Sequence, residues 1–139
     1  VKVIYPVHLN PKVREIAKNK FANNDKVRLI EPLDVLEFHN YMEKAYLIMS
    51  DSGGVQEEAP SLGKPVLVLR DTTERPEGIK AGTLKLVGVD TENIYNQCSE
   101  LLTNKESYEK MAQAKNPYGD GFASKYIVDE LEKEFNNAK

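Results

Sequence analysis

The sequence of 139 residues has very little cysteine and no long apolar run. Its one cysteine, Cys98, excludes an internal disulfide and is compatible with a reducing cytoplasm. Cys98 falls at an apolar position of helical periodicity, so we expect a buried and unreactive thiol. No apolar run approaches the ~20 residues that cross a membrane, and no signal peptide is visible. The composition therefore gives no reason to expect a membrane partner.

An excess of basic charge is also missing. With 19 Lys and Arg against 22 Asp and Glu, the formal net charge is -3, which offers no electrostatic footprint for nucleic acid or an anionic membrane. Any anionic ligand must therefore be held by local geometry. Hydrophobic residues at 40% and charged residues at 29% indicate a soluble, globular chain with a core of its own. Because the chain starts at Val1 inside an expected strand, we expect a fragment of a longer protein.

Apolar runs alternate with amphipathic segments along the chain. Strands are expected at 3–7, 27–30, 46–49, 66–69 and 84–87, and helices at 11–21, 35–45, 53–62, 91–102, 105–115 and 123–137. The continuous apolar runs at 46–49 and 66–69 are typical of parallel strands that helices cover on both faces. The pattern predicts an α/β fold with a doubly wound, Rossmann-like parallel sheet. The polar segment 70–82 is expected to be a solvated loop, with a binding loop as the alternative.

Caps and breakers predict where several helices begin or end. Asn10 and Pro11 supply a cap and a first-turn proline, and Asp34 resembles the start of a capping box. Pro60 lies too deep in its helix and should kink or shorten it. The apolar stripes are expected at Val13, Ile16 and Ala17; at Val35, Phe38, Met42 and Ala45; at Val55, Ala59 and Leu62; and at Ala123, Ile127, Leu131 and Phe135.

Ligands of doubly wound sheets bind at the carboxyl ends of the strands. That edge should bring together five groups that are scattered in the sequence: His8, the 32–38 turn, Ser52-Gly53-Gly54, Glu58 and the loop with Arg75. The edge is therefore where we expect a site.

The turn Ser52-Gly53-Gly54 is a candidate anion site. A strand that ends in small residues and leads directly into a helix leaves unpaired N–H groups and the positive end of the helix dipole facing one spot. Glu58 lies one turn beyond Gly54 on the same face, where a carboxylate could accept hydrogen bonds from ribose hydroxyls. The spacing fits a tight connection with an N-cap equally well, and it matches neither the G-x-x-x-x-G-K-[ST] loop nor G-x-G-x-x-G.

Three segments resemble one known family, in the same order and with similar spacing. The central segment is DSGGVQEEAPSLGKPVLVLRDTTERPEG at 51–78, and the others are PVHLNP at 6–11 and EPLDVLEF at 31–38. Together they are similar to the signature of the non-hydrolysing UDP-N-acetylglucosamine 2-epimerases, over essentially the whole chain. The resemblance implies one half of the two-domain glycosyltransferase-B architecture. Residues 1–139 would form the single, carboxyl-terminal UDP-binding domain, without the amino-terminal domain.

The resemblance also implies roles for the candidate residues around the glycines. Ser52, Gly53 and Gly54 would hold the diphosphate of UDP with backbone amides and a hydroxyl. Glu58 would take the ribose hydroxyls. Arg75 would contact phosphate or sugar.

Two further residues receive roles by the same resemblance. Backbone groups around Phe38 would take the uracil edge. His8 would stand near the diphosphate and near the place where a second UDP-N-acetylglucosamine acts as activator in bacterial members. From the residues alone, a surface histidine that caps a turn is the simpler interpretation of His8.

The family's reaction interconverts UDP-N-acetylglucosamine and UDP-N-acetylmannosamine by elimination and re-addition of UDP. Its acids and bases lie upstream of the matched segments, so we expect no catalytic residue in this chain and no epimerisation by the chain alone. Glu57 is expected to be a solvated helix carboxylate. No metal or cofactor is implied besides the UDP-sugar. The whole protein is expected to be a cytoplasmic bacterial homodimer that serves cell-wall polysaccharide biosynthesis.

Three other functions remain open at this point. A UDP-sugar-dependent glycosyltransferase of the same architecture would present a similar turn and carboxylate. A hydrolysing epimerase would release free sugar and UDP. A nucleotide-binding module without catalysis would need only the binding residues.

Overall fold

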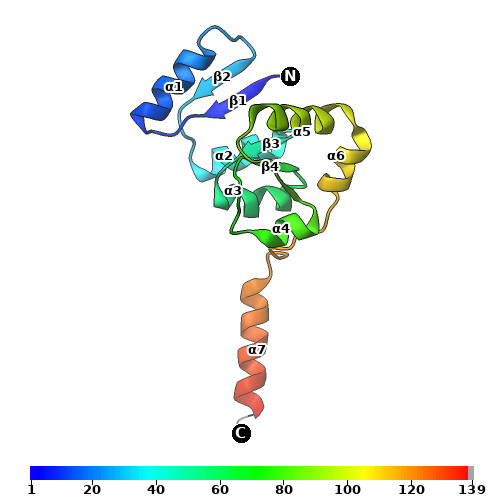
Figure 1. The fold of residues 1–139 in the computed structure, drawn as a ribbon. Helices are drawn as coiled ribbons and strands as arrows, with labels where there is room; N and C mark the ends of the chain where they lie inside the picture. The colour runs from blue at the N-terminus through cyan, green and yellow to red at the C-terminus, as the bar shows by residue number, and fades with distance from the viewer. Residues whose placement is uncertain (138–139) are drawn as a thin grey trace. The chain divides into compact units, whose positions relative to one another are not determined.

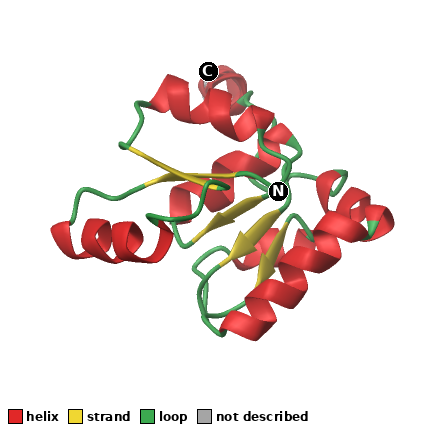
Figure 2. Ribbon diagram, turned by 90° about the horizontal axis from the view of Figure 1, so that it is seen from above, coloured by secondary structure: helices red, strands yellow, loops and turns green. Residues whose placement is uncertain are grey.

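The computed structural model describes residues 1–137, in which strands and helices alternate along the chain (Figure 1). Each strand leads through a loop into a helix, as the colouring of Figure 2 shows. The elements are β1 (Val3–Pro6), α1 (Pro11–Phe21), β2 (Val27–Ile30), α2 (Val35–Lys44), β3 (Ile48–Ser50), α3 (Gly53–Glu58), the 3₁₀ helix η1 (Ala59–Leu62), β4 (Val66–Val68), α4 (Pro76–Ala81), β5 (Leu84–Leu86), α5 (Thr91–Thr103), α6 (Lys105–Ala112) and α7 (Ala123–Asn137). The predicted α/β class is confirmed.

The chain divides into two compact units, Val1–Tyr41 and Met42–Lys139. In the first unit β1 and β2 pair in parallel, and in the second β3, β4 and β5 pair in parallel in that order. The sequence suggested one continuous sheet, whereas the strands described here pair within each unit. A continuous apolar run indicates that a strand is buried on both faces, but it does not indicate which other strand pairs with it. The prediction of a single domain stays a prediction.

α1, α2 and α5 each begin after a side-chain cap. Asn10 Oδ1 accepts from the N–H of Lys12 at 3.0 Å before α1, and Asp34 Oδ1 accepts from the N–H of Glu37 at 2.9 Å before α2. Asp90 caps α5 in the same way. These oxygens satisfy amides that have no partner inside the helix. The three predicted helix starts are therefore confirmed.

The core of the second unit lies around the central strand β4. Val66, Leu67 and Val68 are completely buried, as expected of a strand covered on both faces. Leu67 forms a buried cluster with Val87 and Leu101. The partly buried residues against this cluster are Leu47, Leu69, Ile94, Cys98 and Met111. A packed strand of this kind holds the β3 and β5 ends in fixed register.

Proline and glycine divide the segment between β3 and β4. α3 ends at Glu58, and Pro60 lies in the 3₁₀ turn η1, where its missing N–H removes no α-helical bond. Gly63 then adopts φ 65°, a left-handed conformation that glycine takes without strain. The predicted shortening of this helix by Pro60 is confirmed.

The segment 70–82 contains a helix that the sequence analysis did not predict. α4 begins with Pro76 in its first turn and ends at Ala81, and the residue that caps it, Gly82, has φ 84°. Those are the positions that proline and glycine prefer at the two ends of a helix. The expectation of a solvated loop was wrong for Pro76–Ala81. A helix of under two turns gives too short a pattern to be recognised among so many charged residues.

The last helix, α7, leaves its apolar residues exposed. Those with large apolar side chains in or next to α7 are Phe122, Tyr126, Ile127, Val128, Leu131 and Phe135. Each keeps at least half of its surface accessible. Among the described residues, no helix is long and apolar enough to cross a membrane.

Candidate nucleotide site

The turn after β3 places the backbone amides of Gly53 and Gly54 at the start of α3. Ser52 precedes α3 in an extended conformation, and its own N–H donates to Ser50 Oγ at 3.1 Å. Within the described residues, neither the N–H of Gly53 nor that of Gly54 has a protein acceptor. A backbone N–H without a partner is a strong donor. These two amides can therefore serve a ligand.

Five of the seven predicted site residues come together at this turn. The Cβ of a side chain at Gly53 would lie 4.0 Å from Nη2 of Arg75. At Gly54 it would lie 3.5 Å from Oε1 of Glu58 and 4.0 Å from Oγ of Ser52. The start of α3, which precedes β4, and the loop with Arg75, which follows β4, therefore lie close together at the glycines. Because glycine has no side chain, the space beside the two amides stays open.

Arg75 is held in place by three contacts. Its Nε donates to Oε1 of Glu57, and its Nη1 donates to the carbonyl of Glu74 at 3.2 Å. Its backbone N–H donates to Oγ1 of Thr73 at 3.0 Å. Glu57 was expected to be a solvated carboxylate, and its side chain does keep 43% of its surface exposed. Sequence reasoning missed its ion pair, because the loop before α4 returns to α3 and supplies the cation.

Sequence reasoning missed the hydrogen bonds that join α3 to this loop. Gln56 is completely buried, and its Nε2 donates to the carbonyl of Ser52 at 3.2 Å. Its Oε1 accepts from the hydroxyl of Thr73 at 2.6 Å. The available signal was the spacing, since a residue four positions after Ser52 lies above it on a helix.

Tyr118 connects α4 to the chain that follows α6. Its phenol oxygen accepts from the N–H of Gly78 at 3.1 Å, and its hydroxyl donates to the carbonyl of Arg75 at 3.5 Å. Burial raises the pKa of Tyr118, so the phenol stays protonated at neutral pH. The backbone of Arg75 is therefore fixed from two sides, by Thr73 and by Tyr118.

His8 and Phe38 lie in the first unit. His8 is exposed, and its Nδ1 accepts from the N–H of Asn10 at 3.1 Å, so it does cap the turn before α1. This hydrogen bond leaves Nε2 as the nitrogen that can face a ligand. Phe38 is half-buried near the start of α2, and its N–H donates to the carbonyl of Asp34 at 2.9 Å.

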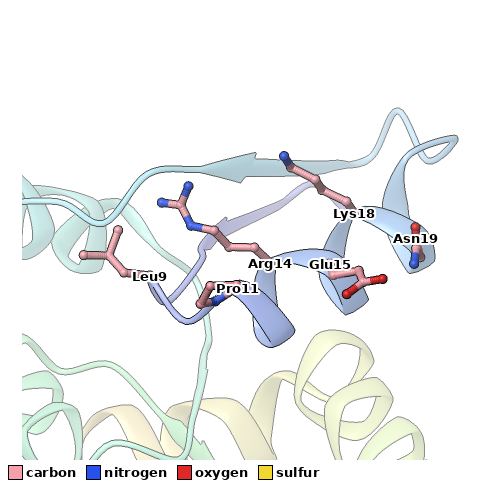
Figure 3. A pocket seen from close by; sticks show the side chains of 6 residues that line it. All are labelled: Leu9, Pro11, Arg14, Glu15, Lys18 and Asn19. Atoms are coloured by element: carbon pink, nitrogen blue, oxygen red, sulfur yellow. The ribbon is translucent and has the colours of Figure 1, made fainter.

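Two shallow hollows lie elsewhere on the surface. One of about 530 Å³ is lined by Leu9, Pro11, Arg14, Glu15, Lys18 and Asn19, whose side chains appear in Figure 3. Arg14 there is paired with Glu31. The other, of about 370 Å³, is lined by Arg70, Asp71, Leu86, Val87, Gly88, Val89, Asp90 and Asn93. Neither contains a predicted site residue, and the described residues hold no group of three side chains suited to a metal ion.

A family model and a sequence relative both match this chain under the same description. The family model described as UDP-N-acetylglucosamine 2-epimerase matches residues 1–132. A Bacillus subtilis protein named UDP-N-acetylglucosamine 2-epimerase is 66% identical over 131 residues, which cover 94% of this chain and 34% of the relative. The chain thus spans about a third of that relative's length.

Solved structures agree with the sequence match. The Neisseria meningitidis UDP-GlcNAc 2-epimerase bound to UDP-GlcNAc has a TM-score of 0.88 and 55% identity, over 95% of this chain and 36% of its own. The Staphylococcus aureus protein MnaA in complex with UDP has a TM-score of 0.90 and 53% identity, over 97% and 37%. The prediction of a Rossmann-like half of a glycosyltransferase-B fold is confirmed. The chain belongs to the UDP-N-acetylglucosamine 2-epimerase family.

Proposed function

We propose that this chain is the UDP-binding part of an enzyme that interconverts UDP-N-acetylglucosamine and UDP-N-acetylmannosamine. The observation that carries the proposal is the pair of amides at Gly53 and Gly54, which have no protein acceptor in the described chain, with the guanidinium of Arg75 beside Gly53. Two consecutive N–H groups and a guanidinium suit a diphosphate, because its oxygens are charged acceptors. Proteins of the same family have been solved with UDP and with UDP-GlcNAc.

In this proposal the second unit holds most of the nucleotide. The Ser52 hydroxyl and the amides of Gly53 and Gly54 bind the diphosphate, with Arg75 as a further phosphate or sugar contact. Glu58 accepts from the ribose hydroxyls. The closeness of Glu58 Oε1 and Ser52 Oγ to Gly54 supports this division of roles.

The first unit supplies the remaining contacts that we propose. Backbone groups around Phe38 take the uracil edge. His8 contributes near the diphosphate and near a second UDP-N-acetylglucosamine that acts as activator. The exposure of His8 and the engagement of its Nδ1 leave Nε2 for such a contact.

The chemistry assigned to this chain is electrostatic. The reaction eliminates UDP to give a 2-acetamidoglucal, exchanges the proton at C2 and adds UDP back. Amides fixed at the diphosphate stabilise the negative charge that develops on the departing UDP. Retaining UDP between the two half-reactions keeps the partners close for re-addition. We assign the acids and bases of the proton transfer to the part of the family's length that this chain does not span.

The complete gene product is proposed to work as a cytoplasmic homodimer. Its activity is tested by incubation with UDP-N-acetylglucosamine and no acceptor. Formation of the manno epimer supports the epimerase. Dependence on an added acceptor would indicate a glycosyltransferase, and release of free sugar with UDP would indicate a hydrolysing enzyme.

The binding role is tested with Glu58→Ala. Removing a charged acceptor of the ribose hydroxyls should weaken UDP binding by ~1–3 kcal/mol in a calorimetric titration. The matched control is Glu132→Ala on α7, which should leave the affinity unchanged. An unchanged affinity for Glu58→Ala would remove this residue from the site.

A further inference from the structure

We infer that Gln56 is a positioning residue, which aims the Gly53 N–H at the ligand and ties the Arg75 loop to the same turn. The inference rests on the proposed UDP-binding function and concerns two residues, Gln56 and Thr73, to which the sequence analysis assigned no role. It starts from burial, because Gln56 is a polar side chain with no exposed surface at all. Such a side chain is costly unless its donors and acceptors are used.

The hydrogen bonds fix which way the Gln56 amide points. The oxygen of Thr73 accepts from the N–H of Arg75, so its hydroxyl proton is available for donation to Gln56. The carbonyl of Ser52 can only accept, so the Gln56 side chain must present its nitrogen to that carbonyl. Its oxygen then faces Thr73 and accepts the hydroxyl proton. Each group in this series of hydrogen bonds is therefore assigned as donor or as acceptor.

The carbonyl of Ser52 is held by Gln56 through two donors. The side-chain Nε2 lies 3.2 Å from it and the backbone N–H lies 3.4 Å from it. The described chain contains no cis peptide bond. In a planar trans peptide the carbonyl and the following N–H point in opposite directions. Anchoring the Ser52 carbonyl toward Gln56 therefore turns the Gly53 N–H away from Gln56.

The same side chain also couples two parts of the site. Through Thr73, Gln56 is linked to the backbone of Arg75, whose guanidinium lies beside Gly53. A rotation of the Ser52–Gly53 peptide would break the bond to Gln56 and disturb the support of the Arg75 loop. Gln56 thus makes the amide and the guanidinium approach one ligand in a fixed arrangement.

The first experiment compares UDP with uridine, which lacks the diphosphate. Thr73→Val removes the hydroxyl at nearly constant volume, and Thr73→Ser keeps it. Thr73→Val should bind UDP about ten-fold more weakly while its affinity for uridine stays the same, and Thr73→Ser should restore UDP binding. Equal losses for UDP and uridine, or no loss, would overturn the inference.

The second experiment uses Gln56 itself. Gln56→Glu cannot donate to the Ser52 carbonyl as a carboxylate, but it can once protonated, and burial raises the pKa of such a group. UDP affinity relative to the unmodified chain should therefore be low at about pH 8 and should recover toward about pH 5.5. Using the ratio at each pH cancels the titration of UDP itself and of every group that the two chains share. A ratio that does not change with pH would contradict the role.

Gln56→Met and UDP binding by the unmodified chain serve as controls, and they distinguish failure of the positioning role from failure of the proposed function. Gln56→Met should lower UDP affinity without recovery at low pH, and circular dichroism checks that it folds. If it does not fold, the comparison of Thr73→Val with Thr73→Ser decides the question. If neither the unmodified chain nor the complete gene product binds UDP, the proposed function fails. If UDP binds and these variants leave its preference over uridine unchanged, only the positioning role fails.

Discussion

The guanidinium of Arg75 donates through Nε to the carboxylate of Glu57, which lies 18 positions earlier in the chain. This ion pair joins the loop before α4 to the helix that follows the glycine turn. Both side chains keep more than a third of their surface exposed, at 35% for Arg75 and 43% for Glu57. Water therefore screens the pair, and its role is to direct Arg75 more than to stabilise the fold.

Separate substitutions of the two partners should have opposite effects on UDP binding. Arg75→Gln removes the cation and should weaken UDP binding about ten-fold. Glu57→Gln keeps an acceptor for Nε but removes a negative charge near the diphosphate. It should strengthen UDP binding about two-fold at low salt, with the gain lost as salt rises. Calorimetric titrations at two salt concentrations measure both effects.

The stability of the Glu57→Gln variant serves as the control. Its free energy of unfolding in urea should stay within ~1 kcal/mol of the original value, because exposed pairs contribute little. Weaker UDP binding in Glu57→Gln would contradict this prediction. It would show that the Glu57 carboxylate helps binding by orienting Arg75 more than it hinders binding by repelling the diphosphate.

Gly54→Ala should separate binding from folding. The added Cβ meets Oε1 of Glu58 at 3.5 Å, an ordinary contact, and alanine favours a helix over glycine by ~1 kcal/mol. The chain should therefore fold as well as before. UDP binding should fall several-fold, because the methyl group occupies space beside the donor amides. Thermal unfolding and UDP titration of the same sample test this, and an unchanged affinity would place the ligand away from Gly54.

The helix starts could be predicted from sequence because their causes are local. Asn10, Asp34 and Asp90 each accept from an amide two or three positions further on. The apolar stripes were less reliable. Ile16 and Val35 were expected to face inward but are 61% and 68% exposed, because periodicity identifies a face without saying what covers it.

The part of the candidate site that local sequence determines, the glycine turn with Glu58 one helical turn later, could be predicted. The turn Ser52-Gly53-Gly54 could be proposed from residue types, because glycine and a helix start have local consequences. The contacts of Gln56 with Thr73, and of Glu57 with Arg75, depend on the loop before α4 folding back over α3. Nothing within a short window of sequence specifies that return, so the pairs became visible only in the fold.

Gly78→Ala should destabilise the second unit. A Cβ at Gly78 would lie 2.4 Å from Cδ1 of Leu84 and 2.5 Å from the phenol oxygen of Tyr118. Overpacking of this kind costs about 1–3 kcal/mol in the free energy of unfolding. Urea unfolding of Gly78→Ala measures the loss, with Gly54→Ala as the control whose Cβ meets no close contact. An unaltered midpoint would mean that the packing around α4 is loose.

Cys98 should react slowly with thiol reagents in the folded chain. Burial raises the pKa of the thiol above its ordinary value of 9.0, which reduces the fraction of reactive thiolate near pH 8. Because the folded-state pKa is raised, the thiol's contribution to stability is present below pH 9.0 and is lost as the pH rises through the folded value. Labelling rates at pH 8, with and without urea, measure the difference. Equal rates would show that Cys98 is accessible in the folded state.

The exposed stripe of α7 should make the chain self-associate. Ile127 and Leu131 keep 61% and 51% of their surface accessible, and they lie four positions apart on one helix face. Apolar surface of this kind favours contact with another apolar surface. The double variant Ile127→Gln and Leu131→Gln should sediment as a monomer at concentrations where the original chain forms larger species. Its free energy of unfolding should not fall, because both side chains are already solvated, and a large loss would instead mean that the stripe packs against its own chain.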